Sequence, residues 1–186
     1  MGRIVVTEFI SLDGVIEAPG GGEGFEYDGW TFEFDRGEDG NTFKLDEVME
    51  AEAQLLGRRT YEGFAAAWPN YTDEVGFADK MNSMPKYVLS TTLESAGWNN
   101  STILRSFDEV AEVRDELDGV ILVAGSAQLV QGLLERDLVD ELRLMVFPVA
   151  LGTGKRLWGE TADRKQFNLA DVKTVGEGIA ILTLRR

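Results

Sequence analysis

The chain has 186 residues, enough for one sizeable domain, and we expect residues 1–186 to form a single one. Its 33 acidic and 18 basic residues give a formal charge of −15, which disfavours nucleic acids and anionic membranes as partners. The sequence contains neither Cys nor His, which excludes disulfides, the usual zinc ligands and catalytic devices built on Cys or His.

Nothing in the sequence indicates export or membrane insertion. The N-terminus, Met1–Glu8, turns polar too soon for a signal peptide. No apolar run approaches the roughly 20 residues that span a bilayer. We therefore expect a soluble, cytoplasmic protein that acts on a small molecule and has no metal site.

The first part of the chain predicts a buried strand followed by a long loop. Ile4–Ile10 is rich in β-branched and apolar residues, and Ser11–Gly14 ends the pattern. From Ala18 to about Thr42 we expect irregular structure that carries five aromatic residues, namely Phe25, Tyr27, Trp30, Phe32 and Phe34. Such a loop fits a functional lid and a cover over a core edge or subunit contact equally well.

From Thr42 onward, helices and strands alternate. Apolar spacing and capping residues predict helices over Thr42–Gln54, from Thr60 to Pro69, from Asp73 onward, and after Ser106 and Ser126. The predicted strands are Leu55–Gly57, Tyr87–Ser90, Thr102–Leu104, Val120–Val123 and Leu142–Leu151. At the end, Leu169–Val175 and Gly178–Leu184 predict an antiparallel hairpin. Together these elements indicate an α/β domain with a mainly parallel sheet.

The turn after Val120–Val123 is suited to a phosphate group. Ligands of parallel α/β sheets gather at the carboxyl ends of the strands. The small residues Gly125, Ser126 and Ala127 let a pyrophosphate approach the backbone, where free amides and the helix dipole attract it. A plain tight turn needs the same residue types, so both interpretations stand.

Two further junctions carry side chains that bind anions. The segment Arg58–Thr60 places two guanidinium groups at a predicted helix start, and an ion pair with Glu62 or Glu52 is the alternative. Ser90 and Thr91 follow another predicted strand and offer hydroxyl groups to a phosphate, although hydroxyls are also common in ordinary turns.

Four segments, in order, resemble the dihydrofolate reductase-like fold: Ile4–Ile16, Gln54–Phe64, Lys86–Thr91 and Val120–Leu134. Leu56–Glu62 is similar to the Gly-Arg-x-Thr-aromatic-Glu signature of dihydrofolate reductases. The segment Leu138–Gly154 carries Val-Asp-Glu, then Pro148, then Gly-x-Gly. It resembles the reductase domain of the bacterial bifunctional riboflavin-biosynthesis protein and its stand-alone relatives. The resemblance implies a three-layer α/β fold.

The resemblance also implies bound NADPH, with NADH as the alternative. The residues that would hold the adenosine 2′-phosphate are Arg58, Arg59, Ser90 and Thr91. Those expected at the other phosphates are Gly57, Thr60, Gly125, Ser126, Ala127 and Gln128. Val15 and Ile16 would lie beside the nicotinamide. Dihydrofolate reductases often carry Arg where this chain has Gln128, and the missing positive charge is why NADH stays an alternative.

The substrate side matches this fold less closely. The proton would come from water or from a carboxylate, for which Asp13 and Glu50 are the candidates, with turn capping as the alternative for Asp13. Trp30 and Tyr61 are candidates to stack on a flat ring, with core packing as the alternative. Riboflavin-type reductases grip a ribose phosphate with an Arg-rich stretch, whereas Phe43–Leu56 is acidic here. This departure disfavours a phosphorylated sugar as substrate.

These features predict an NADPH-dependent reductase that transfers a hydride to a small, planar heterocycle of pteridine or pyrimidine type. Nicotinamide would bring chemistry that a chain without Cys and His lacks. The alternatives are a non-catalytic nucleotide-binding module, the 5-amino-6-(5-phosphoribosylamino)uracil reductase of riboflavin synthesis, and a true dihydrofolate reductase. By analogy with relatives of this fold, we expect a homodimer that pairs through the hairpin and Leu142–Val149.

Overall fold

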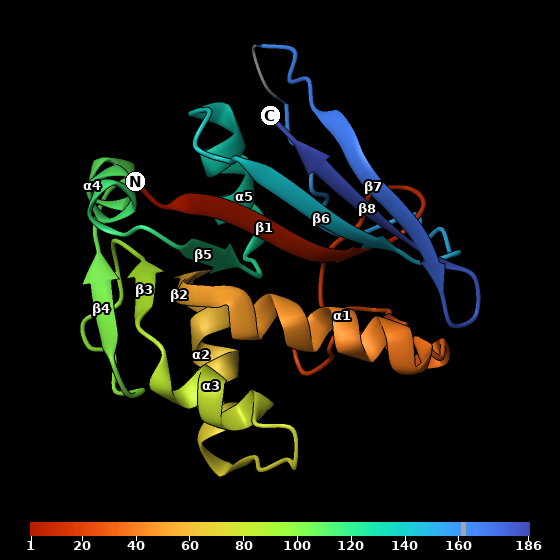
Figure 1. Cartoon of the computed structure of the whole chain (residues 1–186), viewed down its shortest axis with the longest axis horizontal. Helices are drawn as coiled ribbons and strands as arrows, with labels where there is room; N and C mark the ends of the chain where they lie inside the picture. The colour runs from red at the N-terminus through yellow and green to blue at the C-terminus, as the bar shows by residue number, and fades with distance from the viewer. Residues whose placement is uncertain (161–162) are drawn as a thin grey trace.

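Strand β1 (Arg3–Ile10) lies inside an eight-stranded sheet of order β4-β3-β2-β5-β1-β6-β8-β7 (Figure 1). The computed structural model describes residues 1–160 and 163–186. The other strands are β2 (Ala51–Gly57), β3 (Lys86–Leu89), β4 (Ser101–Leu104), β5 (Val120–Val123), β6 (Glu141–Val146), β7 (Asn168–Val175) and β8 (Ile179–Arg185). Strands β1 to β6 pair with one another in parallel, whereas β8 is antiparallel to β6 and β7. The predicted α/β class with a C-terminal antiparallel hairpin is confirmed.

Helices cover both faces of the sheet and produce three layers (Figure 1). On one face lie α4 (Phe107–Glu116) and α5 (Ala127–Glu135). On the other lie α1 (Gly37–Glu50), α2 (Arg58–Ala67) and α3 (Phe77–Ser83). Because side chains alternate along a strand, β1 contributes to both interfaces. Ile4 and Val6 belong to the apolar cluster of the first face with Val130, and Val5 belongs to that of the second with Val48.

The long loop after β1 packs onto the antiparallel part of the sheet. It contains the short 3-10 helix η1 (Trp30–Glu33), and a second one, η2 (Trp68–Asn70), follows α2. The rings of Trp30 and Phe34 meet Phe147 edge-on, with centroid distances of 5.3 and 5.7 Å. Trp30 and Phe34 therefore cover a core edge, which was one of the two roles predicted for the loop, whereas Tyr27 and Phe32 are exposed.

The predicted boundaries of the first helix are wrong. Helix α1 begins at Gly37, which has a positive φ of 66°, rather than at Thr42. It ends at Glu50, because Ala51 adopts extended backbone and starts β2. Residues 51–54, expected to be helical, pair with β5 and β3 instead. Strand pairing inside the sheet overrides the helical propensity of this Ala- and Glu-rich segment.

Two further elements are shorter than predicted. Helix α3 begins at Phe77 rather than at Asp73, because the carboxylate of Asp73 accepts the hydrogen bond of the Phe77 N–H and caps the helix from outside. Strand β6 ends at Val146 rather than at Leu151, since the chain enters a tight turn at Phe147.

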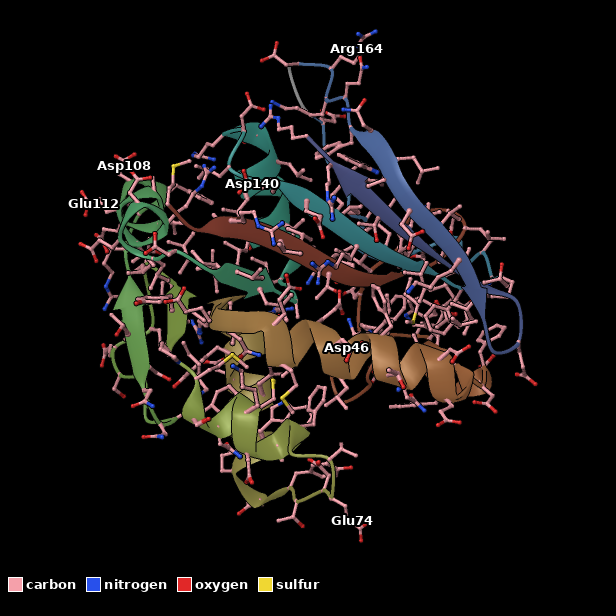
Figure 2. All side chains as sticks on the ribbon, in the orientation of Figure 1. Asp46, Glu74, Asp108, Glu112, Asp140 and Arg164 are labelled. Carbon is pink, nitrogen blue, oxygen red and sulfur yellow. The ribbon has the colours of Figure 1, made fainter. Side chains whose placement is uncertain are left out.

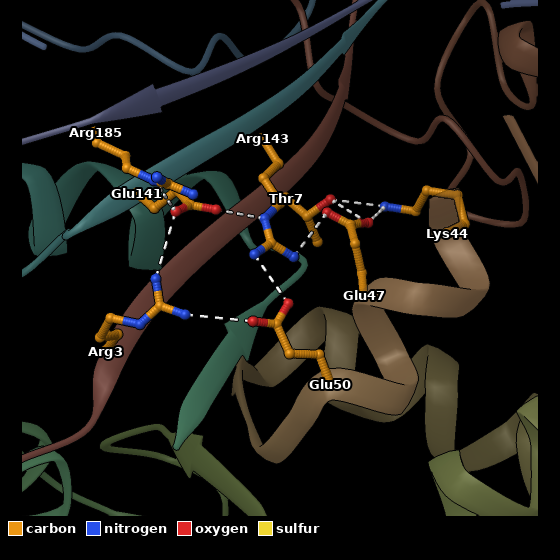
Figure 3. Close-up of polar contacts among 8 residues, drawn as sticks. All are labelled: Arg3, Thr7, Lys44, Glu47, Glu50, Glu141, Arg143 and Arg185. Carbon is orange, nitrogen blue, oxygen red and sulfur yellow. Dashed lines mark hydrogen bonds and ion pairs between the residues drawn. The ribbon is translucent and has the colours of Figure 1, made fainter. Parts of the chain in front are cut away.

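A buried carboxylate fixes α1 against β1 (Figure 3). Glu47 is 1% exposed and lies 2.6 Å from the ammonium of Lys44. It also accepts a hydrogen bond of 2.9 Å from the hydroxyl of Thr7 on β1. A buried charge is tolerated only when it is paired in this way, so the pairing holds α1 in one orientation on the sheet.

Arg143 on β6 extends the same network to the other strands (Figure 3). Its guanidinium lies 3.0 Å from Glu50 and 2.6 Å from Glu141. Glu141 also accepts a hydrogen bond of 2.8 Å from Arg185 on β8. Burial alone would raise the pKa of Glu141, but the hydrogen bonds from Arg185 and Arg143 lower it. Ion pairs thus link α1, β6 and β8.

Much of the negative charge lies on the surface. Figure 2 shows Asp108 and Glu112 directed outward from α4 and Glu74 directed outward from the loop before α3, and all three are exposed. Within the described ranges, no helix combines the length and apolarity that crossing a membrane requires.

Lys86, at the start of β3, is a fully buried cation. Its ammonium donates hydrogen bonds to the carbonyl oxygens of Asn82 (2.9 Å), Met84 (2.8 Å) and Asn99 (3.0 Å). It lies 4.2 Å from the centroid of the Trp98 ring. Burial lowers its pKa from 10.5 to about 8. Lys86 therefore ties the end of α3 to β3 and to the loop before β4.

We predict that Lys86→Met lowers the free energy of unfolding by about 3 kcal/mol at pH 7, because three buried carbonyl groups lose their donor. Between pH 8 and 10.5 the unfolded chain still binds the proton that folded Lys86 has lost. The stability of the wild type should therefore rise relative to that of the variant across this window. Urea unfolding of both proteins at several pH values measures the difference, and a constant difference would contradict the lowered pKa.

Candidate functional site

Two strand-to-helix turns touch each other at the carboxyl edge of the sheet. The N–H of Gly57, the last residue of β2, donates to the carbonyl oxygen of Gly125, which follows β5, at 3.2 Å. A Cβ atom at Gly57 would lie 2.3 Å from Oγ of Ser126. Gly125 has φ +100°, and a Cβ atom there would lie 2.9 Å from Oγ1 of Thr60. Only glycine at both positions allows this approach.

The two helices that follow these turns begin without a side-chain cap. At the starts of α2 and α5, the N-cap residues Gly57 and Ser126 make no capping hydrogen bond within the described chain. In contrast, the hydroxyl of Ser106 caps α4 by accepting from the Glu109 N–H. The first-turn N–H groups of α2 and α5 therefore lack a side-chain acceptor. With the positive ends of both helix dipoles, these N–H groups have the chemistry that an anion requires.

Arg58 connects this pair of turns to the third junction. Its guanidinium donates to the hydroxyl of Thr92 at 2.8 Å and forms an ion pair with Glu62 at 2.9 Å. The Ser90 hydroxyl accepts from the Thr92 N–H, so it fixes the turn after β3. Thr91, in that turn, is exposed. Strand β3 neighbours β2, and all three junctions consequently lie at one edge. The ion pair with Glu62 is the alternative that the sequence allowed for Arg58.

The loop after β1 reaches the same edge. Burial raises the pKa of Glu23 in this loop. Lys155 and Arg59 are close enough to oppose this rise electrostatically, but burial outweighs them. Arg59 and Gln128 are both exposed. The charged side of α2 therefore faces a loop that also carries acidic groups.

Val15 and Ile16 are buried in the turn after β1 and are held by the segment before Leu157. Val15 forms an isolated bridge with Arg156, and the Ile16 N–H donates to the Lys155 carbonyl at 2.9 Å. The backbone of this turn is therefore fixed, although the two side chains come from a loop.

Asp13 fixes the same turn from the other side. Its carboxylate accepts hydrogen bonds from the hydroxyl of Ser11 (2.6 Å) and from the N–H groups of Leu151 (3.0 Å) and Gly152 (2.7 Å). The Ser11 hydroxyl, followed by the backbone donors, lowers the pKa of Asp13 to about 2. Asp13 is ionised at neutral pH, which suits a turn clamp and does not suit a proton donor.

The structure does not bring the other predicted substrate residues to this edge. Glu50 pairs with Arg3, the first residue of β1, at 3.3 Å and so lies at the opposite end of the strands. Trp30 and Tyr61 are each 3% exposed. The Trp30 indole donates to the Glu17 carbonyl, and Tyr61 packs in the cluster between the sheet and α1 to α3. Both rings take the core positions that were the alternative to stacking.

One residue near the site was missed by the sequence analysis. Glu8 belongs to β1, which was predicted only as an apolar strand, and its side chain is 6% exposed. An acidic residue at an inward position of a buried strand was the available signal.

The donor set at the three junctions fits a dinucleotide. Helix N-termini and glycine turns suit a pyrophosphate, and Arg58, Arg59, Ser90 and Thr91 add charge and hydroxyls for a further phosphate. No group of three or more acidic residues able to hold a metal occurs in the described part of the chain. The cofactor roles of the individual residues remain predictions.

Comparison with known proteins agrees with the fold. The family model "RibD C-terminal domain" matches residues 3–181. The uncharacterized proteins YwjB and YyaP of Bacillus subtilis (strain 168) are both 28% identical to the chain, over 187 and 184 residues. The alignments cover 98% and 95% of this chain, and 98% and 91% of YwjB and YyaP.

Two solved structures share the architecture. The "Putative riboflavin biosynthesis protein" of Shewanella sp. PV-4 aligns with a TM-score of 0.77 and 21% identity over 99% of this chain and 98% of its own. Dihydrofolate reductase from Enterococcus faecalis, complexed with NADP(H) and RAB-propyl, aligns with a TM-score of 0.58 and 17% identity over 99% of this chain and 96% of its own. The predicted resemblance and the dihydrofolate reductase-like fold are confirmed.

We predict that Asp13→Asn destabilises the protein at pH 7, because an amide cannot accept all three hydrogen bonds as a carboxylate does. The folded pKa of Asp13 lies below the unfolded value of 3.8, so its contribution is present above pH 3.8 and is lost as the pH falls towards 2. Thermal unfolding of wild type and variant should therefore differ at pH 7 and converge near pH 2. A difference independent of pH would contradict this role.

Proposed function

Since the chain belongs to the RibD C-terminal domain family, we propose that it is an NADPH-dependent reductase that transfers a hydride to a small, planar heterocycle. The observation that carries the proposal is the contact between the Gly57 and Gly125 turns, where two helices begin without side-chain caps. Two helix N-termini at one point form an anion site stronger than either alone.

Backbone N–H groups would hold the pyrophosphate, and side chains would hold the 2′-phosphate. The N–H groups that begin α2 and α5 suit the pyrophosphate, with Thr60 and Gln128 at its sides. The guanidinium groups of Arg58 and Arg59 suit the 2′-phosphate, with Ser90 and Thr91 beside them. In a chain of charge −15, these two cations supply the local attraction that the surface as a whole lacks.

The nicotinamide ring would lie beside Val15 and Ile16. When bound, the reduced cofactor supplies a hydride, which the chain itself cannot do. The residues of the chain would align the two rings and exclude water. The hydrogen bonds of Asp13 would help to align the rings, because they fix the backbone of the turn that contains Val15 and Ile16. The loop that contains Trp30 would help to exclude water, because it already covers the neighbouring edge of the core.

We predict that the double substitution Arg58→Ala and Arg59→Ala weakens NADPH binding roughly 10- to 100-fold and leaves NADH binding nearly unchanged, because only NADPH carries the 2′-phosphate. Fluorescence titration with both nucleotides measures the effect. Arg164→Ala is the matched control, since Arg164 lies at the far end of the molecule from α2 (Figure 2). Unchanged NADPH affinity in the double variant would show that the arginines do not hold the phosphate.

We predict that Gly57→Ala weakens NADPH binding at least tenfold, because the added Cβ lies 2.3 Å from Oγ of Ser126 and forces the two turns apart. Gly63→Ala is the control within α2, since a Cβ there meets nothing within 4 Å. It should bind NADPH as the wild type does and gain about 0.5–1 kcal/mol of stability.

Consumption of NADPH, followed at 340 nm with dihydrofolate, dihydropterin and quinone panels, separates a reductase from a non-catalytic binding module. Turnover of at least one compound supports the reductase. Tight NADPH binding without any turnover would favour the module.

A further inference from the structure

Glu8, near the end of β1, is a buried carboxyl group that lacks a full set of partners. Its Oε1 atom has no hydrogen-bond partner among the residues that the structure describes, and the side chain is 6% exposed. An unsatisfied buried polar atom destabilises the folded state, so folding alone does not explain a glutamate here. Burial raises the pKa of Glu8 to about 8. At pH 7 the group is therefore neutral and carries an O–H donor.

The register of the sheet places Glu8 beside the Gly125 turn. Strands β1 and β5 pair as far as Val6 and Val123, whereas β1 continues to pair with β6 to its end. Glu8 lies two residues beyond Val6, as Gly125 lies two residues beyond Val123. Both residues therefore stand where the two parallel strands part, which is where α/β sheets bind ligands.

The side chain of Glu8 shares a face with residues of the expected nicotinamide position. Because side chains alternate along β1, Glu8 projects to the same face as Val6 and Ile10. Ile10 and Ile16 belong to one apolar cluster on that face, and so does Leu144, the register partner of Glu8 on β6. The carboxyl group thus lies among apolar side chains close to the expected nicotinamide position.

Two charged groups act on Glu8 from neighbouring elements. Lys44 on α1 favours the carboxylate, and Glu23 in the loop after β1 disfavours it. Burial outweighs both, and the cluster on the α5 side is apolar. The protonation of Glu8 should therefore respond to any new charge that binds next to it.

We propose that Glu8 is the general acid of the reaction and gives its carboxyl proton to the substrate. This inference rests on the proposed function. The bound dihydronicotinamide would supply a hydride, with its electron pair, to the carbon of a C=N bond. As the π electrons move to nitrogen, the O–H bond of Glu8 breaks and an N–H bond forms. The substrate is reduced, the cofactor is oxidised, and the carboxylate then regains a proton from water.

Neither sequence-predicted proton carrier can take this place. Asp13 is ionised at neutral pH, and Glu50 lies at the opposite end of the strands. Glu8 combines a neutral carboxyl group with a position at the strand ends. A general acid must hold its proton at the working pH and release it to the reacting atom, and Glu8 meets the first requirement.

Proton release on nucleotide binding tests this proposal without a known substrate. The oxidised nicotinamide ring is positively charged and the reduced ring is not, so NADP+ beside Glu8 should lower its pKa and expel its proton. Calorimetry at pH 7 in two buffers of different ionisation enthalpy counts the protons. We expect the wild type to release about half to one proton more with NADP+ than with NADPH. The 2′-phosphate is common to both nucleotides and cancels in this difference.

The Glu8→Gln variant should still bind both nucleotides, but it should release the same number of protons with NADP+ as with NADPH. Glu52→Gln is the matched control, since Glu52 lies at the start of β2 and accepts from the Gly119 N–H, away from the site. It should release protons as the wild type does. The wild-type comparison of the two nucleotides needs no variant, so the test stands even if Glu8→Gln does not fold.

The outcomes separate this inference from the proposed function. If both nucleotides bind but the proton difference is absent, or persists in Glu8→Gln, Glu8 is not beside the nicotinamide and only this inference fails. If neither nucleotide binds, both the proposed function and this inference are wrong. With a compound that turns over, Glu8→Gln should lower kcat at least 100-fold and remove the fall in rate above pH 8. An unchanged rate would overturn the proposal.

Discussion

The contact between the Gly57 and Gly125 turns is the constraint on which the site depends. It brings the ends of β2 and β5 within a backbone hydrogen bond of each other, and it directs the starts of α2 and α5 to one place. A side chain at either glycine would collide with Ser126 or Thr60. The helices need no special sequence to attract an anion once they are placed there, because every helix N-terminus carries unpaired N–H groups.

The buried carboxyl groups that stabilise the fold and the one that we propose for catalysis lie at different places on the sheet. At the α1 face, Glu47 and Glu141 are buried with partners that account for their charge. Near the strand ends, Glu8 is buried with one oxygen atom unpartnered. Glu47 also has one oxygen atom without a hydrogen bond, but it forms ion pairs with Lys44 and Arg143, whereas Glu8 forms no ion pair among the described residues. Two kinds of buried carboxyl group thus occur on one sheet, and an ion pair with a neighbouring cation distinguishes them. The paired ones orient α1, whereas the unpaired one remains free to change its protonation state.

The sequence predicts the parts of this structure that depend on local patterns. Alternating elements and small-residue turns indicate the parallel sheet and its three junctions, because periodicity and glycine act over a few residues. It does not predict where α1 ends, since the pairing of β2 with β5 decides the state of Ala51. It does not predict the partners of Asp13 either, because Leu151 and Gly152 are far away in the chain. Trp30 and Tyr61 illustrate a third limit: an aromatic residue fits a core and a ligand site equally well until its neighbours are known.

The distribution of charge decides how the fold responds to salt. The Glu47–Lys44 and Glu141–Arg143 ion pairs are shielded by the sheet and α1, so dissolved ions weaken them little. The excess carboxylates outside repel one another, and dissolved cations reduce that repulsion. Concentrated salt would therefore weaken the repulsion among the surface carboxylates more than it weakens the buried ion pairs.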